Sequence, residues 1–391
     1  MRARRAASLA GALFALGFGQ ELWWRYLPAY LRALGASAFS VGLFGTLRDL
    51  LDAAYAYPGG LASDRLGTRH SLLLFSALTT AGYVVYALVG SVTAVFAGLL
   101  LVMAWPSLGL PSTFAVIGEE LEGPGRIRGF TAQAVVKRLP ILVAPPLGGL
   151  LLERYGMESG MRLGFGLSIA IAVPTLLFLS RAMRQNVPGA VVSPSRGDRS
   201  KPRLHPALRQ LLVADCLVRL CEGLPDVFLV VWALEVVRIS PLQFGVLTSI
   251  LMGTAILSYA PAAALAGRVE KKPFVLLTYA FFTAFPVAVV LASSFPALAI
   301  AYGIGGLREI GEPARKALIL DLADPAARGR TVGLYYGIRG FSVAGAAAVG
   351  GALWTLSPAL TFIVAAALGL AGTAWAAAFL PSTSRRQEVL R

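Results

Sequence analysis

The chain has 391 residues, of which 57% are hydrophobic and only 14% are charged. Soluble domains average about a quarter charged residues, so this composition excludes an ordinary water-soluble globule and indicates a bundle of membrane-spanning helices. The net charge of +15 would suggest nucleic-acid binding in a soluble protein. Here most basic residues lie between apolar runs, so we expect no nucleic-acid partner and expect these charges to orient the chain in a lipid bilayer.

Apolar runs of about 20 residues, the length that crosses a bilayer, recur along the chain. The first run contains Glu21 and Arg25 and lacks a small-residue cleavage site, so we interpret it as a spanning helix and not as a secretory leader. The runs predict an all-α integral membrane protein with twelve transmembrane helices. The predicted spans are 7–30, 38–62, 71–90, 92–118, 132–152, 161–180, 208–233, 241–265, 273–293, 295–318, 331–352 and 358–380.

A polar, basic segment rich in Pro, Ser and Gly, residues 181–205, separates the sixth span from the seventh. We interpret it as a linker between an N-terminal six-helix bundle, 1–180, and a C-terminal six-helix bundle, 206–391. Most Lys and Arg residues between spans fall on one side, and the positive-inside rule makes that side cytoplasmic. The sequence therefore predicts a multi-pass protein of a bacterial-type cytoplasmic membrane, with both termini and the linker in the cytoplasm.

The two halves repeat at an offset of about 202 residues. Residues 58–65, PGGLASDR, align with residues 261–268, PAAALAGR, and residues 144–149, APPLGG, align with residues 346–351, AAAVGG. The same offset places Lys137 on Arg339. A duplication of six helices is an established plan for transporters, in which the binding site lies near the bilayer midplane where the halves meet.

The turn after the second span reads GLASDRLGTRH from Gly60 to His70. It resembles the G-x-L-A-D-R-x-G-R-R signature of the major facilitator superfamily, although Ala62, Ser63 and Thr68 depart from that pattern. With the duplication and the basic linker, the resemblance covers essentially the whole chain. It implies a two-bundle fold and a transport cycle of alternating access, and it names no substrate.

The resemblance also implies a cytoplasmic gate at this turn. A carboxylate at Asp64 can pair with arginines or with the positive N-terminus of a neighbouring helix, and Gly67 permits a tight turn. The family identifies that neighbour as the eleventh helix. The alternative is that these charges merely solvate a loop. The candidate gate residues are Gly60, Asp64, Arg65, Gly67, Arg69, Arg328 and Arg330.

Two further features bear on the type of transport. Residues 145–149, PPLGG, resemble the G-P-x-x-G-G stretch of exporters in the superfamily, with Ala144 in place of the usual glycine. Ordinary packing of small residues explains the stretch equally well. The fourth span lacks the buried arginine that is usual in that superfamily, which weakens the case for drug–proton exchange of the familiar type.

Ionisable residues inside the predicted spans are the main functional candidates, because each costs several kcal/mol in hydrocarbon. They fall into three clusters, on the first two spans, on the seventh and on the tenth, with Lys137 and Arg339 as matching cations. On the seventh span the spacing predicts one polar stripe through Asp215, Arg219, Glu222 and Asp226. The tenth-span cluster continues to Arg315 and Lys316. The candidate substrate-binding or coupling residues are Glu21, Arg25, Arg48, Asp49, Asp52, Lys137, Arg219, Glu222, Asp226, Arg308, Glu309, Glu312 and Arg339.

A carboxylate near an arginine can switch between a salt-bridged and a neutral state as a cavity opens to each side of the membrane. We expect proton coupling at one of four residues, Asp49, Asp52, Glu222 or Asp226. Asp49 and Asp52 come first, because the aligned positions of the second half, Met252 and Ala255, are apolar. The alternative is that the charges within each cluster form permanent structural ion pairs.

Helix breaks and aromatic residues add two smaller expectations. Trp105 and Pro106 interrupt the fourth span, and a run from Gly303 to Pro313 interrupts the tenth. Such breaks suit helices that bend, and they suit tight packing equally well. Trp23 and Trp24, with tyrosines close by, are interpreted as an aromatic belt at the outer membrane interface rather than a substrate-stacking surface.

The sequence thus favours a secondary active transporter for a small solute, proton-coupled, with efflux as a possible direction. Charges of both signs favour a polar, anionic or zwitterionic solute. The alternative on the same scaffold is a lipid or amphiphile translocator. An enzyme lacks support, since no catalytic His cluster, Ser/His pair or cofactor fingerprint is present. The sequence contains no P-loop, so we do not expect ATP to drive transport directly. We expect a monomer without cofactor or bound metal, whose partners are the solute, protons and the lipid bilayer.

Overall fold

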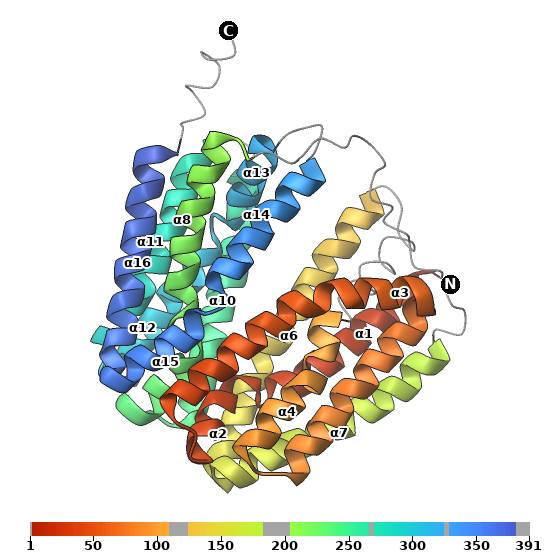
Figure 1. Cartoon of the computed structure of the whole chain (residues 1–391). Coiled ribbons are helices and arrows are strands. Elements are labelled where there is room, and N and C mark those ends of the chain that lie inside the picture. The colour runs from red at the N-terminus through yellow and green to blue at the C-terminus, as the bar shows by residue number, and fades with distance from the viewer. Residues whose placement is uncertain (1, 109–123, 183–203, 266–269, 324–327, 381–391) are drawn as a thin grey trace. The chain divides into compact units, whose positions relative to one another are not determined.

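The structure is a computed structural model that describes the backbone of residues 2–108, 124–182, 204–265, 270–323 and 328–380 (Figure 1). Within these ranges, the side chains of residues 2–10, 56, 57, 60, 63, 64, 68, 108, 124–137, 182, 259–265, 328 and 329 lie outside the description. All regular secondary structure in the described part of the chain is helical. The predicted all-α class is therefore confirmed for these residues.

The chain forms two compact units. Unit 1 comprises residues 1–37, 47–193 and 238–249. Unit 2 comprises residues 38–46, 194–237 and 250–391. Each unit thus includes the first turns of one helix, and the remaining turns of that helix belong to the other unit. The predicted domain boundaries at residues 180 and 206 remain a prediction.

Unit 1 contains both long helices and short helical turns. The element α3 contains two of the predicted spans and bends sharply between them at Gly67. The elements are α1 (Arg2–Glu21), η1 (Trp24–Tyr26), α2 (Leu27–Ala33), α3 (Ala38–Leu88), α4 (Val92–Val102), η2 (Ala104–Leu108), α6 (Pro124–Tyr155) and α7 (Met157–Ala182).

Unit 2 has more interruptions within its predicted spans. Its elements are α8 (Pro206–Gly223), η3 (Asp226–Phe228), α9 (Leu229–Val231), η4 (Trp232–Val236), α10 (Pro241–Leu265), α11 (Lys271–Leu291), α12 (Phe295–Gly306), η5 (Leu307–Glu309), α13 (Glu312–Leu322), α14 (Arg328–Val343), α15 (Ala346–Leu356) and α16 (Pro358–Phe379). Helix α8 packs between α16, α11 and α14 (Figure 1).

Glycine and proline residues lie where the predicted helices are interrupted. Gly67 has a φ of 76°, a left-handed conformation that favours glycine, so the predicted tight turn is confirmed. The fourth span passes from an α-helix into a π-helical turn at Trp105 and Pro106. The tenth span ends its first helix at Gly306 and begins a second at Glu312, with Pro313 in the first turn. Both predicted interruptions are therefore confirmed.

The seventh span differs from expectation. Helix α8 ends at Gly223, and a 3-10 turn follows Pro225, which lacks the backbone N–H that a continuing helix needs. Asp226 therefore lies beyond the break. The prediction of a single straight stripe from Asp215 to Asp226 was wrong at its last residue.

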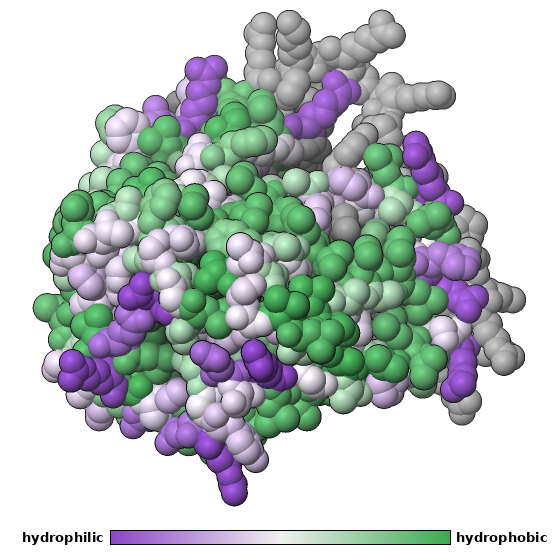
Figure 2. All heavy atoms as spheres, turned by 60° about the horizontal axis from the view of Figure 1, so that its bottom comes forward, coloured by the Kyte–Doolittle hydropathy of each residue, from purple (hydrophilic) through white to green (hydrophobic). Residues whose placement is uncertain are grey.

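Five helical segments among the described residues are long and apolar enough to cross a membrane: 69–88, 157–181, 241–258, 271–291 and 358–379. Helix α8 does not qualify, since its 18 residues carry four charges, Arg209, Asp215, Arg219 and Glu222. The count of twelve crossings stays a prediction. Figure 2 shows broad apolar areas on the face it presents, and large side chains such as Leu257 and Phe341 are 77% and 83% exposed. Lipid is the natural environment for such surfaces.

The aromatic residues near the end of α1 form the core of unit 1. Trp23 is 1% exposed and packs edge-to-face on Tyr83, Tyr86 and Phe165. Its indole N–H donates to Ser168 Oγ at 2.9 Å. The interpretation of Trp23 as part of an interface belt was wrong, because its ring is enclosed by protein on every side.

Local features recur at the offset of 202 residues. The 3-10 turn at 24–26 in unit 1 corresponds to the 3-10 turn at 226–228 in unit 2. Gly148 lies against the carbonyl oxygen of Leu22, and Gly350 lies against that of Leu224. A Cβ atom would stand 1.7 Å from that oxygen at Gly148 and 2.1 Å at Gly350. Both glycines are needed for the same close approach of two backbones.

Candidate functional site: a buried ionic network in unit 2

The charges of the seventh and tenth spans meet in one place in unit 2. Helix α8 contributes Asp215, Arg219 and Glu222 from successive turns of one face. Helix α13 contributes Glu312 and Arg315, which ion pairs connect directly to the α8 residues. Two clusters that are about 90 residues apart in sequence therefore form a single network.

Asp215 and Arg315 are the centre of the network. Their side chains are 1% and 2% exposed, and Arg315 Nη1 donates to Asp215 Oδ2 at 2.5 Å. Two tyrosine hydroxyls also donate to this carboxylate, from Tyr279 to Oδ1 at 3.1 Å and from Tyr335 to Oδ2 at 2.9 Å. A buried charge is tolerated only when it is paired and hydrogen-bonded in this way.

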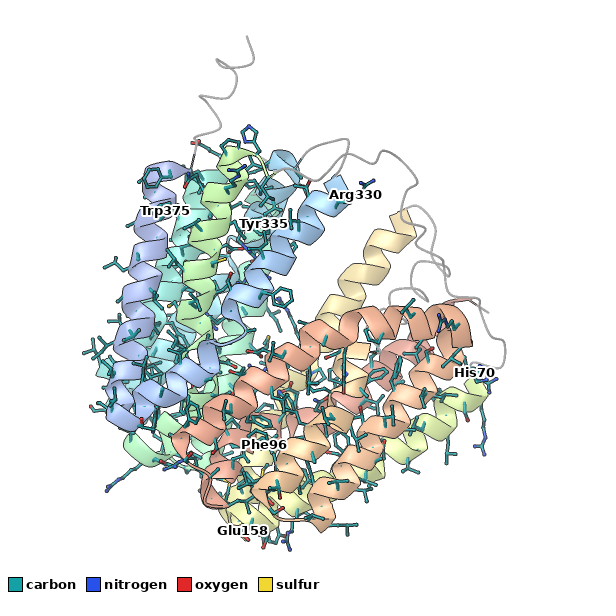
Figure 3. All side chains as sticks on the ribbon, viewed as in Figure 1. His70, Phe96, Glu158, Arg330, Tyr335 and Trp375 are labelled. Atoms are coloured by element: carbon teal, nitrogen blue, oxygen red, sulfur yellow. The ribbon has the colours of Figure 1, made fainter. Side chains whose placement is uncertain are left out.

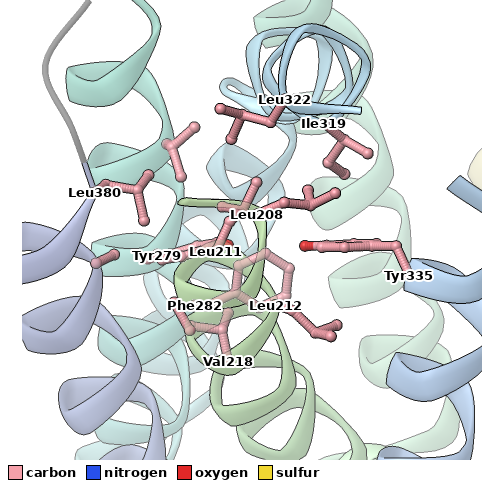
Figure 4. Packing of buried hydrophobic residues seen from close by; sticks show 13 residues of the cluster. Leu208, Leu211, Leu212, Val218, Tyr279, Phe282, Ile319, Leu322, Tyr335 and Leu380 are labelled. Carbon is pink, nitrogen blue, oxygen red and sulfur yellow. The ribbon is translucent and has the colours of Figure 1, made fainter. Parts of the chain in front are cut away.

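Tyr279 and Tyr335, which bond Asp215, also belong to the apolar core of unit 2. Tyr279 on α11 and Tyr335 on α14 pack with Leu208, Leu211 and other buried residues of α8 (Figure 4). Figure 3 places Tyr335 on the part of α14 that faces α8. The Asp215 carboxylate is thus held from three helices besides its own.

The second layer of the network lies around Glu222 and Glu312. Arg219 Nη1 lies 2.6 Å from Glu222 Oε2, and its Nη2 lies 3.7 Å from Glu312 Oε2. Arg315 Nη2 also lies 2.7 Å from Glu312 Oε1. On its outer side, the 55%-exposed Lys316 approaches Glu312 at 3.4 Å.

Two arginines complete the network with longer ion pairs. Arg308 Nη1 lies 3.5 Å from Glu222 Oε1, and Arg339 Nη1 lies 3.4 Å from Asp215 Oδ2. Arg308 stacks over the rings of Phe282 and Phe285, at 4.9 and 4.8 Å from their centroids. Arg339 stacks over Tyr336 at 4.6 Å. These cation–π contacts position both guanidinium groups.

In unit 1, ion pairs join candidates that are close to one another in sequence. Arg25 bonds Glu21 at 3.1 Å, and Arg48 bonds its neighbour Asp49 at 2.8 Å. Asp52 instead accepts a hydrogen bond of 2.6 Å from Ser107, a buried residue of the π-helical turn η2.

The remaining predicted residues are placed less fully. The side chains of Lys137, Gly60, Asp64 and Arg328 lie outside the described residues. Arg69 donates to the carbonyl oxygen of Ser180 at 2.7 Å, which joins the turn after the second span to the end of α7. Arg65 and Arg330 are exposed, and Glu309 is half-buried. The gate assignment stays a prediction.

Sequence reasoning undervalued the centre of this site. Asp215 and Arg315 were recognised as the ends of polar stripes and were left out of the candidate coupling residues. Their signal was a charge within an apolar helix, with the i, i+4 and i, i+3 partners Arg219 and Glu312. Tyr279 and Tyr335 carried no signal, since tyrosine is common in apolar helices.

Chemically, the network holds three carboxylates and four guanidinium groups that are linked by ion pairs of 2.5–3.7 Å, beside the apolar core of unit 2. Such a set can exchange ion-pair partners, bind an anion or take up a proton on a carboxylate. Among the residues that the structure describes, no group of three or more His, Cys, Asp or Glu side chains could hold a metal ion.

Comparisons with known proteins agree on one family. The sequence model described as "Major Facilitator Superfamily" matches residues 9–221 and 211–391. No curated protein sequence matches the chain. A bacterial homologue of the iron transporter ferroportin, in an inward-facing state, is 12% identical with a TM-score of 0.77, over 96% of this chain and 98% of that one.

Two further solved structures are similar. A POT family transporter in complex with 5-aminolevulinic acid is 14% identical with a TM-score of 0.74, over 95% of both chains. The human organic anion transporter MFSD10 is 18% identical with a TM-score of 0.64, over 96% of this chain and 99% of that one. At these identities the likeness concerns the fold alone.

Proposed function

Because the chain belongs to the major facilitator superfamily, and is thus a multi-pass membrane transporter rather than an enzyme, we propose that it is a secondary active transporter. It moves a small solute across the cytoplasmic membrane by alternating access between two six-helix halves, 1–180 and 206–391, and couples this movement to protons. The repeated contacts of Gly148 and Gly350 support a two-fold repeat of the helices.

The observation that carries the proposal is the ionic network around Asp215. A buried ion pair is weak support for stability, since apolar residues of similar size are often as stable. Four arginines and three carboxylates among apolar helices therefore need another reason, and a solute or ion pathway supplies it.

For the proton, we propose Asp52 as the first candidate. Among the described residues its carboxylate makes no ion pair, and its partner is the hydroxyl of Ser107 at 2.6 Å. The carboxylates of Asp215 and Glu312 each face at least two cations. A carboxylate bonded to a hydroxyl loses less when it is protonated than one held by guanidinium groups.

The proposed orientation has both termini and the linker 181–205 in the cytoplasm, and the proposed direction is export. Cysteines introduced at Ser195 and Ser384 should resist an impermeant thiol reagent in intact cells. Labelling of either residue from outside would overturn this topology. Accumulation of substrate by inside-out vesicles with an acidic lumen would support export, whereas accumulation by right-side-out vesicles in an acidic medium would support import.

The proposed gate is Asp64, at the cytoplasmic turn after the second span. The Asp64→Asn variant should reduce turnover severely and leave the affinity for substrate largely intact. A few kcal/mol decides which side of such a transporter is open. A normal turnover number in that variant would exclude the gate.

The proposed transport is tested with purified protein in proteoliposomes that contain a pH-sensitive dye. The panel includes 5-aminolevulinic acid, a dipeptide, small organic anions, a sugar and a lipophilic cation. We expect at least one solute to move protons, and the proton movement to stop when an ionophore collapses the pH gradient. Solute flux that is insensitive to the ionophore would overturn proton coupling, and flux of lipid alone would favour a translocator.

A further inference from the structure

We propose that Arg308 and Arg339 bind the carboxylate of an organic acid, which is the substrate class of this transporter. The inference rests on the proposed function, because it assigns a ligand to the same ionic network. It begins from the charges of the residues joined by ion pairs in unit 2, of which Asp215 and Arg315 are buried and the others are partly buried. These are the carboxylates of Asp215, Glu222 and Glu312 and the guanidinium groups of Arg219, Arg308, Arg315 and Arg339.

The network is one anion short. Its three carboxylates carry three negative charges against four positive charges on the arginines, before Lys316 on its exposed side is added. Arginine keeps its proton in proteins, so this excess cannot be removed by deprotonation. An uncompensated positive charge in an apolar surrounding attracts an anion strongly.

The excess is localised on two residues. Glu222 is held by Arg219 at 2.6 Å, so Arg308 at 3.5 Å is its second and weaker partner. Asp215 is held by Arg315 at 2.5 Å and by two tyrosines, so Arg339 at 3.4 Å is likewise a secondary partner. Both carboxylates would remain paired if these two arginines turned to a ligand.

Neighbouring groups also hold both arginine side chains in position. Arg308 Nε donates to the carbonyl oxygen of Gly305 at 2.7 Å, and its guanidinium plane lies on two phenylalanine rings. Arg339 lies on the ring of Tyr336. Their side chains are 14% and 21% exposed, so neither is fully enclosed by protein. Little entropy is lost when such positioned groups bind.

The chemistry of the donors selects the ligand. A guanidinium offers parallel N–H groups that match the two oxygens of a carboxylate. The neighbouring rings of Phe282 and Phe285 favour an organic acid with an apolar part over a small hydrated inorganic anion. The two arginines pair with residues seven apart on α8, about 10 Å along the helix axis, so they offer two anchoring points for one solute.

The test measures binding without any gradient. Purified full-length protein in detergent is heated with benzoate, succinate, glutamate or 5-aminolevulinate, each at equal ionic strength and each beside the amide in which its carboxylates are replaced by uncharged carboxamide groups. We expect at least one acid to raise the thermal midpoint and its amide not to do so. Arg308→Gln and Arg339→Gln should each weaken that acid's binding by about tenfold or more.

Two comparisons keep the result interpretable. Lys271→Gln removes the ion pair between Lys271 and Asp321, outside the network in the same unit, and should leave binding unchanged. Arg308→Lys keeps the charge and should retain part of the affinity, even if Arg308→Gln folds poorly. The proposal is overturned if no acid stabilises more than its amide, if inorganic phosphate does so equally, or if the stabilisation survives both glutamine substitutions. Because no flux is measured, acid binding without proton-coupled transport would count against the proposed function alone.

Discussion

The two units place similar charges in different surroundings. In unit 1, Arg25 with Glu21 and Arg48 with Asp49 are pairs of near neighbours in sequence, and each side chain is between 15% and 36% exposed. In unit 2, Asp215 and Arg315 come from different helices and are almost fully buried. Pairs of the first kind contribute about 0–1 kcal/mol. Breaking a pair of the second kind costs several kcal/mol.

The difference separates two roles that one sequence pattern suggests. Carboxylates that are saturated by arginines resist protonation and organise the helices around them. Asp52 in unit 1 is instead bonded to a hydroxyl and makes no ion pair among the described residues. These different contacts are the basis for proposing the network of unit 2 as the solute site and Asp52 of unit 1 as the proton carrier.

The largest expected effect is the difference in the free energy of unfolding between the variants Asp215→Asn and Asp49→Asn. The first substitution leaves Arg315 and Arg339 with less compensation in the core and should lower the free energy of unfolding by about 3–5 kcal/mol. The second removes a half-exposed pair between adjacent residues and should change it by less than about 1 kcal/mol. Thermal unfolding of both purified variants in one detergent measures this, and equal midpoints would remove the distinction between the units.

The glycine contacts give the next effect. Gly148→Ala in unit 1 and Gly350→Ala in unit 2 each drive a Cβ into a backbone carbonyl and should each cost about 1–3 kcal/mol or more. Gly148→Ala should be the more damaging, since its Cβ would lie closer to the oxygen. Gly166→Ala and Gly337→Ala, with nothing within 4 Å of the new atom, are the matched controls. Unfolding midpoints that match those controls would refute the close approach of the backbones.

Proton coupling is compared next. Asp52→Asn should reduce transport driven by a pH gradient by about tenfold or more, which corresponds to about 1.4 kcal/mol, and should spare the exchange of labelled for unlabelled substrate. Dye-reported proton flux and exchange are measured on the same proteoliposomes. If Asp52→Asn and Asp49→Asn both keep full coupling, the titrating carboxylate is in unit 2, at Glu222 or Asp226, or the transporter is not driven by protons.

The smallest effect concerns the aromatic core of unit 1. Ser168 Oγ accepts from Trp23 and donates to the carbonyl oxygen of Gly19 at 2.6 Å. Ser168→Ala leaves a buried indole N–H without a partner and should lower stability by about 1 kcal/mol. Ser342→Ala, at an exposed hydroxyl that bonds its own helix, should change it by less. A larger loss for Ser342→Ala would contradict the buried role of Ser168.

The sequence by itself determined the class of protein, the helical structure of the described segments and the turn at Gly67. Gly67, Gly306 and Pro225 act through backbone conformation and missing N–H groups, which are properties of single residues, although Pro225 was overlooked as a helix end. The helical period also identified the face of α8 that carries Asp215, Arg219 and Glu222.

Only the tertiary structure decided which faces meet. Nothing in the sequence said that α8 and α13 pack so that Arg315 reaches Asp215, or that Tyr279 and Tyr335 point their hydroxyls at the same carboxylate. Nor did it say that Trp23 is enclosed by other aromatic rings instead of facing lipid. The helical period relates residues within one helix, whereas contacts between helices depend on how all their side chains pack together.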